Sequence, residues 1–137
     1  MNPLARDTMT LYMKYGATWT RAVITGVIWT QKTVRTNDSN GNLKLVRQTS
    51  ITIPVEASVI VGGARASHVE PKAYAGTAGT WTLDKGFIVV YGENATEITN
   101  AAALVALTAA SGTYATIQAV GDNTHRAMLN HWQVEAV

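Results

Sequence analysis

Three histidines and their neighbouring carboxylates are the residues of this chain that could hold a metal ion or move a proton. His68 is followed two positions later by Glu70, and Asp122 precedes His125 by three positions in a turn-forming segment. A facial triad of Asp122, His125 and His131 is conceivable if the chain bends there, and it would suit a metal-dependent hydrolase. None of these spacings matches a helical or knuckle metal motif, so a metal site is the weaker interpretation.

Other signatures of catalysis are absent from the sequence. It contains no G-x-S-x-G motif, no phosphate-binding loop and no dinucleotide fingerprint. Nothing marks a glycosidase pair among its nine acidic residues, and the lack of cysteine excludes disulfides and thiolate nucleophiles. His131 beside Trp132 is better explained as a strand residue at a sheet edge. We therefore expect a protein that is not an enzyme and that uses no cofactor.

The overall composition predicts one domain with an unusually uncharged surface. A chain of 137 residues can bury one substantial core. Only 15% of the residues are charged, against about 25% in a typical domain, which suggests that neighbouring proteins cover part of the surface. A net charge of +2 with scattered basic residues gives little support for nucleic-acid binding. No signal peptide and no apolar run of about 20 residues is evident, so we expect neither export nor a membrane span.

Most of the chain carries strand patterns. Gly26 lies in the middle of one apolar run, where a β-bulge or a close approach of another backbone is the usual cause. In a regular strand Trp19 and Trp29 would share a face, and a bulge at Gly26 would place them on opposite faces. Alanine and leucine favour a single helix at residues 97–110, and residues 62–79 form a long Gly/Ala/Pro-rich loop. The predicted strands are Thr8–Tyr15, Trp19–Thr30, Val55–Val61, a strand-turn-strand unit over Trp81–Tyr91, and a closing hairpin of Thr113–Val120 with Ala127–Val137. The fold class is mainly β: a small β-barrel or sandwich with a long hairpin, one long loop and one short helix.

Residues 31–53 form the most informative local feature. Two extended runs flank the segment Asn37-Asp-Ser-Asn-Gly41, and Asn-Gly between extended runs is a strong hairpin signal. The pattern near the tip is polar and basic, and Pro54 should end the second strand. The hairpin is either a solvated element or an arm that touches a partner subunit or a phosphate backbone. With two residues of the long loop, its basic residues are the candidate contacts with a partner or with a channel lumen: Lys32, Arg35, Lys44, Arg47, Arg65 and His68.

Four segments together resemble a known group of virion proteins. They are Val27-Ile-Trp29, Ile51-Thr-Ile-Pro54, the segment Trp81-Thr-Leu-Asp-Lys-Gly-Phe-Ile-Val-Val-Tyr-Gly-Glu93, and the ending Val120-Gly-Asp-Asn…Leu129-Asn-His-Trp-Gln-Val-Glu135. In this order they are similar to the head-tail connector proteins of long-tailed bacteriophages, which are often labelled minor capsid proteins. The family has Asp or Asn more often than Phe at the position of Phe87.

The resemblance implies a stopper, or head-closure, protein of the virion. Such a protein is a β-barrel subunit that forms a homo-oligomeric ring below the portal and adaptor, closes the DNA channel and receives the tail. It would meet portal or adaptor proteins above, tail proteins below, and packaged DNA without sequence specificity. On this basis we expect the long loop to lie in the lumen and the hairpin to contact the adaptor ring. Two alternatives are a tail terminator and a carbohydrate-binding adhesion module, in which exposed Trp and Tyr would stack on sugars.

Overall fold

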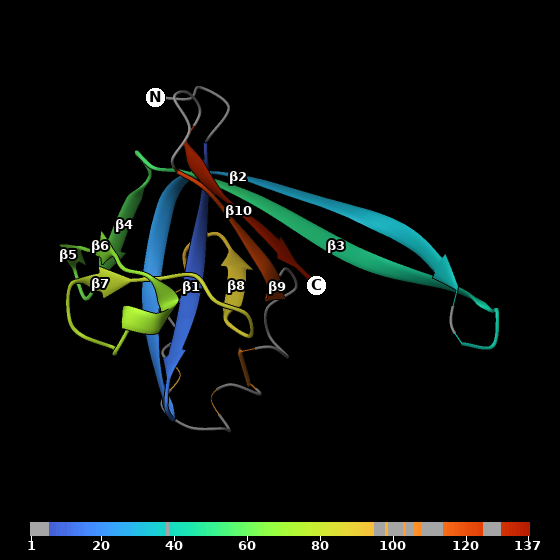
Figure 1. The fold of residues 1–137 in the computed structure, drawn as a ribbon, viewed down its shortest axis with the longest axis horizontal. Helices are drawn as coiled ribbons and strands as arrows, with labels where there is room; N and C mark the ends of the chain where they lie inside the picture. Colours follow the sequence, from blue (N-terminus) through green and yellow to red (C-terminus); the bar gives the residue numbers. More distant parts are fainter. Residues whose placement is uncertain are drawn as a thin grey trace.

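The computed structural model describes residues 6–37, 39–94, 98, 103, 106–107, 114–124 and 130–137, and leaves the side chains of residues 34, 36, 44 and 46 undescribed. Its elements are dominated by antiparallel strands (Figure 1). In chain order they are β1 (Asp7–Tyr15), β2 (Thr18–Asn37), β3 (Leu43–Pro54), β4 (Ser58–Val61), β5 (Ala64–Arg65), β6 (Ser67–His68), the 3₁₀ helix η1 (Pro71–Ala73), β7 (Thr80–Trp81), β8 (Ile88–Tyr91), β9 (Tyr114–Asn123) and β10 (His131–Ala136).

Six strands close into a barrel. The order β1-β8-β9-β10-β3-β2 returns to its start because β1 also pairs with β2 along Asp7–Tyr15. Closure removes the free edges that an open sheet of this size would present. The structure therefore confirms the mainly β prediction and decides between the two predicted architectures in favour of a barrel.

A bulge at Gly26 sets which side chains of β2 face the interior. Asp7 pairs with Val27 and Thr8 pairs with Thr25, so Gly26 is an extra residue, and its φ of 94° is one that glycine adopts without strain. Before the bulge Ala22 and Ile24 are buried, and after it Val27 is buried and Trp29 packs beside it. Trp19 packs against a separate cluster. The predicted bulge and the predicted reversal of the two tryptophans are both confirmed.

The interior is filled from every strand of the barrel. Its largest fully buried side chains include Met9 and Leu11 on β1, Ile51 and Ile53 on β3, and Ile117 on β9. The closing hairpin supplies Val134 and Ala136. At about 25 cal/mol per Å² of apolar surface removed from water, this interior is the main source of the barrel's stability. β9 and β10 pair directly, which confirms the predicted closing hairpin; β10 begins at His131, and the predicted start at Ala127 lies outside the described residues.

A smaller apolar cluster lies on the outside of the barrel. Tyr12, Ile88 and Val90 from β1 and β8 pack there with Ile98 and Leu107 from the connection between β8 and β9. Ala103, Ala106 and Leu107 have helical backbone, and the remaining positions of the predicted helix, apart from Ile98, lie outside the described residues. Among the described residues of this connection, Ile98 and Leu107 thus cover one outer face of the sheet.

Two predictions about residues 62–91 were wrong in detail. The long loop contains β5, β6 and η1, and Tyr74 within it is buried in the main core. β7 is only Thr80–Trp81 and pairs in parallel with β6, so Trp81–Tyr91 is not a strand-turn-strand hairpin. The turn after Asp84 is present, since the Phe87 N–H donates to the Asp84 carbonyl over 3.3 Å. The strand after this turn, β8, ends at Tyr91, whose side chain is 47% exposed. Long-range pairing decided these elements more than local pattern did.

The distal halves of β2 and β3 leave the barrel as a two-stranded ribbon, which we call the arm (Lys32–Gln48). The pairing of β2 with β3 runs without a register shift from Ile28 opposite Thr52, in the barrel, to Asn37 opposite Leu43, near the tip of the arm. Figure 1 shows the ribbon extending well away from the remaining strands. The predicted hairpin at residues 31–53 is confirmed, as is the end of its second strand at Pro54.

Candidate functional site

The arm has no strand partner on either outer edge within the part of the chain that the structure describes. β1 accompanies β2 only as far as Val27, and β10 accompanies β3 only from Pro54 to Thr49. Beyond these points the backbone donors and acceptors of two edges face outward. A two-stranded ribbon is marginal by itself in water, so the barrel at its root must hold it in place. The arm is therefore a projecting element with two edges free to pair.

One face of the arm combines apolar and cationic side chains. Leu43, Leu45 and Arg47 alternate along β3 and share a face, and Arg35 lies opposite Leu45 in the register. Leu43 is 64% exposed and Leu45 is 61% exposed. In the barrel, the same side of β3 carries Ile51 and Ile53, which are fully buried. The side of the strand that faces the core inside the barrel thus faces solvent on the arm.

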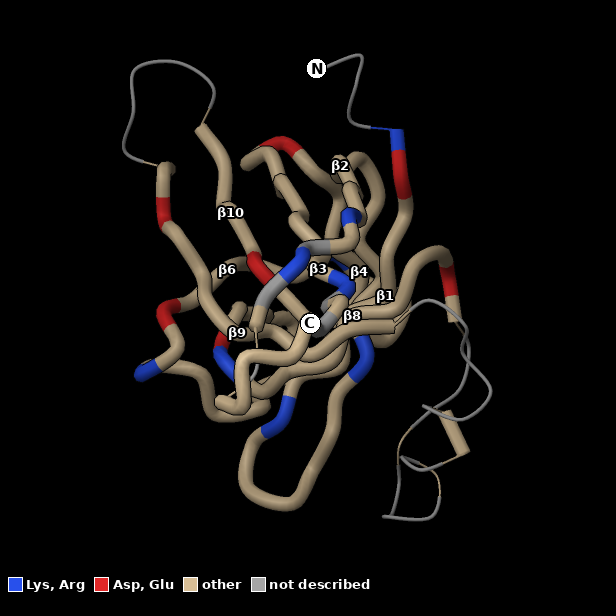
Figure 2. The backbone as a smooth tube through the Cα atoms, turned by 90° about the vertical axis from the view of Figure 1, so that its right-hand side faces the viewer, with Lys and Arg blue, Asp and Glu red and all other residues tan. Residues whose placement is uncertain are grey.

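The four basic residues of the hairpin are divided between the two faces. Lys32, opposite Gln48, and Lys44, opposite Thr36, occupy the positions of the other face. The side chain of Lys44 lies outside the described residues. Figure 2 looks along the arm toward the barrel. The sequence prediction of a single basic arm is thus resolved into an apolar-cationic face with Arg35 and Arg47 and a second, polar face.

A cavity of about 450 Å³ opens on the side of the barrel, between β6 and η1 on one hand and the hairpin β9–β10 on the other. Glu70, Asp84 and Asp122 contribute three carboxylates, against one lysine, Lys85. The apolar part of the wall includes Leu83, Val120 and Trp132. A surface with this lining favours a ligand that is both cationic and apolar.

A bulge in β9 helps to form the cavity. Glu135 pairs with Ala119 and Ala136 pairs with Ile117, so Gln118 is the extra residue, and it is exposed at the cavity wall. Beyond the bulge, Val120 and Asp122 occupy the register positions opposite Val134 and Trp132. Bulges commonly redirect side chains next to binding sites. The local sequence gives no sign of this bulge, because no glycine or proline marks it.

His68 lines the cavity and packs against two tryptophans, whose ring centroids are themselves 5.1 Å apart. Its ring centroid lies 4.9 Å from that of Trp81 and 4.6 Å from that of Trp132. Burial lowers the pKa of His68 below its ordinary value of 6.5, and the nearby negative charges of Glu70 and Asp122 only partly oppose this effect. The ring is therefore neutral at pH 7. This residue was predicted as a lumen contact, and the structure places it in an aromatic stack at the barrel side.

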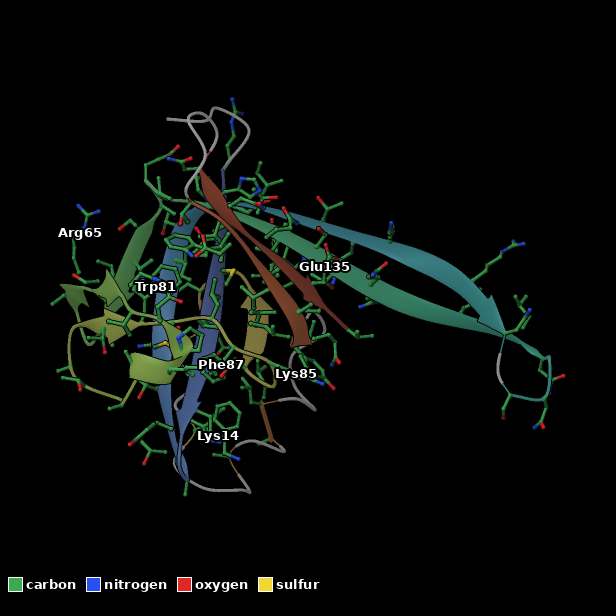
Figure 3. The ribbon with its side chains drawn as sticks, viewed as in Figure 1. Lys14, Arg65, Trp81, Lys85, Phe87 and Glu135 are labelled. Carbon is green, nitrogen blue, oxygen red and sulfur yellow. The ribbon has the colours of Figure 1, made fainter. Side chains whose placement is uncertain are left out.

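Of the other candidate residues, Glu70 and Asp122 line the cavity with His68, whereas Arg65 and His131 do not. Arg65 is exposed on β5, at the side of the barrel away from the arm (Figure 3). His131 lies near Asn123, with 3.4 Å between its Nε2 and the amide nitrogen, and Asp122 accepts hydrogen bonds from Thr124. His125 lies outside the described residues. Among the described residues no three His, Asp or Glu side chains are grouped as metal ligands.

The tryptophans do not form an exposed stacking platform. Trp81 is 3% exposed, and Trp29 and Trp132 pack against the main core. Trp19 packs against the outer cluster, and its ring lies 5.6 Å from the Lys14 ammonium. The most exposed aromatic residues are Tyr15 at 52% and Tyr91 at 47% among those that the structure describes. The adhesion-module alternative thus has no tryptophan surface to support it.

A comparison with known proteins yields a family but no function. Within the described part of the chain, no helix combines the length and the apolar character that crossing a membrane requires. No curated protein and no solved structure matches this sequence. Residues 4–137 match the sequence profile of a family of unknown function, DUF6751, and the chain belongs to that family.

Proposed function

We propose that this protein is a structural subunit of the head-tail connector of a long-tailed bacteriophage. In this function the barrel is the body of a stopper subunit in a homo-oligomeric ring, and the arm contacts a neighbouring protein of the connector. The ring closes the DNA channel below the portal and adaptor and receives the tail. The activity is assembly, with no reaction and no cofactor.

The observation that carries this proposal is the uncovered core-side face of the arm. Leu43 and Leu45 are more than 60% exposed on an element that the barrel does not need for its own core. Contiguous exposed apolar residues bordered by charges are typical of surfaces that a partner covers. The low charge of the whole chain supports the same interpretation, because a ring subunit shares surface with two neighbours.

The four sequence segments that resemble connector proteins lie on elements of the barrel and on the root of the arm. Ile51-Thr-Ile-Pro54 ends β3 where it meets β10, and the C-terminal segment forms β10 itself. The resemblance therefore involves the strands that build the body. The long loop is held against the barrel by Tyr74, which is buried in the main core, and hydrogen bonds from the N–H groups of Ser67 and Val69 to the carbonyls of Gly79 and Trp81 bring its two ends together. This attachment makes the arm the stronger candidate for contact with a partner.

Binding to phage particles tests the proposal. The purified chain is incubated with DNA-filled tailless heads, or with free tails, of the same phage, and the bound fraction is measured by gradient sedimentation. We expect the chain to sediment with heads and to be absent from free tails. Binding to tails alone would assign the chain as a tail terminator, and binding to neither particle would reject a virion function.

A further inference from the structure

We infer that the partner of the arm is a second copy of this chain, and that the arm's apolar-cationic face docks in the barrel-side cavity lined by Glu70, Asp84 and Asp122. The inference rests on the proposed function only in assigning the contact to the connector ring. The contact itself follows from three properties of the chain: charge, apolar character and geometry.

The charges of the two surfaces are complementary. The arm face presents Arg35 and Arg47, and residues 28–55 contain only one acidic residue, Asp38. The cavity presents three carboxylates and one lysine, while the imidazole of His68 adds no positive charge at pH 7. Like charges across an interface are costly and opposite charges set its register. A basic segment from another copy therefore suits the cavity better than an acidic one.

Their apolar parts are complementary as well. Leu43 and Leu45 are the most exposed large hydrophobic residues among those described, and the cavity offers Val120 and Trp132, which are only partly buried. Removing an exposed leucine side chain from water favours association. An apolar centre with a charged rim is the usual anatomy of a specific protein interface.

The geometry excludes the same contact within one subunit. The ladder from Ile28 opposite Thr52 to Asn37 opposite Leu43 is unbroken, so the arm does not fold back onto its own barrel. Figure 1 shows it leading away from β9, β10 and β6, which border the cavity. The six paired positions from Lys32 to Asn37 give a reach of about 20 Å at ~3.3 Å per residue. Each subunit thus offers an arm to one neighbour and a cavity to another.

An arm-to-cavity contact is heterologous, because two different surfaces of the same chain meet. Repetition of such a contact produces a closed ring when the rotation between subunits closes, and an open filament when it does not. The arm and the cavity are therefore enough to join copies of this chain into an assembly without any other subunit type, and the rotation between neighbours decides whether that assembly closes.

Disulfide trapping tests the contact. The chain has no cysteine of its own, so only the introduced cysteines can form a disulfide. A variant with Leu45→Cys on the arm is mixed with a second variant carrying Gln118→Cys at the cavity wall under mild oxidation. The protein concentration is about 1 mM, so that weak association is captured. The matched control replaces Gln118→Cys with Ala17→Cys, which is exposed in the β1–β2 turn outside the cavity. We expect arm-cavity dimers at least tenfold in excess of arm-turn dimers. Equal yields, no cross-linking, or a predominance of arm-arm dimers would overturn the inference.

A charge exchange provides the second test. Arg47→Glu should weaken association at least tenfold, measured by sedimentation equilibrium, and combining it with Glu70→Arg should restore most of the loss. Glu70 is suited to this change because its side chain makes no capping hydrogen bond to η1. Failure of the double variant to recover would contradict the contact.

The two proposals can fail separately. Arm-cavity cross-linking without binding to heads would retain the contact between copies and reject the connector assignment. Binding to heads without arm-cavity cross-linking would retain the assignment and reject the second copy as the arm's partner.

Discussion

β2 and β3 each belong to two environments, and the comparison between them explains the molecule. Inside the barrel, the core-facing side of β3 carries Ile51 and Ile53, both fully buried. On the arm the same side carries Leu43 and Leu45, both largely exposed. The apolar alternation of β3 continues unchanged from the barrel into the arm. In the barrel it places side chains in the core, and on the arm it leaves apolar side chains that a partner protein can cover.

The largest difference should appear on truncating one residue from each environment. Ile51→Ala should lower the free energy of unfolding by about 2–5 kcal/mol, because it leaves a cavity in the barrel interior. Leu45→Ala should change it by no more than about 0.5 kcal/mol, since the side chain is exposed in the isolated chain. Chemical denaturation of both variants measures this. Equal losses would show that the arm is part of the folding core.

The reverse pattern is expected for association. Leu43→Ser combined with Leu45→Ser should weaken binding to heads by about tenfold or more, or roughly 1.4 kcal/mol, because it removes the apolar part of the arm's contact face. The melting temperature should stay close to that of the unchanged chain. A suitable control is Thr33→Ser, which leaves both leucines in place on the same face. Binding as tight as the control would show that the leucines are not covered in the assembly.

Asp7 marks the point where the two environments meet. Its carboxylate accepts a hydrogen bond from the backbone N–H of Trp29 at 3.0 Å and another from the Tyr91 hydroxyl at 3.1 Å. The bond from the hydroxyl raises the pKa of Tyr91. Asp7→Ala should cost about 1 kcal/mol by leaving the Trp29 N–H without this acceptor where β2 departs from β1. Thermal denaturation should show a smaller loss for Tyr91→Phe, which keeps that bond. Equal losses would place the effect in the tyrosine.

The smallest effect expected is a pH dependence from the cavity. Burial lowers the pKa of His68, so as pH falls below about 6.5 the unfolded chain takes up a proton before the folded one. Stability should therefore decrease on acidification, and His68→Phe should reduce that decrease while keeping an aromatic ring against Trp81 and Trp132. Denaturation at pH 7.5 and at pH 5.5 gives the comparison. An unchanged slope in the variant would show that the ring titrates as freely in the folded chain as in the unfolded chain.

Local sequence chemistry predicted the features that one segment determines by itself. Asn40-Gly41 gave the hairpin, Pro54 ended β3, and Gly26 gave a bulge that reverses the faces of β2. These signals are steric and act over a few residues, so a single sequence contains them. The basic residues of the arm were found for the same reason, although the division between its faces required the register.

Closure and the cavity could not be read from local pattern. The pairing of β1 with both β2 and β8 depends on which edges meet after folding, and the alternation of apolar residues is the same in an open sheet. The cavity collects His68, Asp84, Gln118 and Trp132 from separate segments. Only His68 among these was a candidate contact, and its packing against Trp81 and Trp132 could not be predicted because these aromatic neighbours are distant in sequence.

Removal of the arm tests the central claim most directly. Joining Gln31 to Thr49 with an Asn-Gly turn excises Lys32–Gln48 and leaves the barrel strands and their pairing with β10 intact. Tailless heads incubated with this variant or with the whole chain are compared by cryo-electron microscopy. We predict symmetric ring density at the portal vertex with the whole chain and none with the variant, which remains folded. A ring of equal occupancy from the armless barrel would contradict the account.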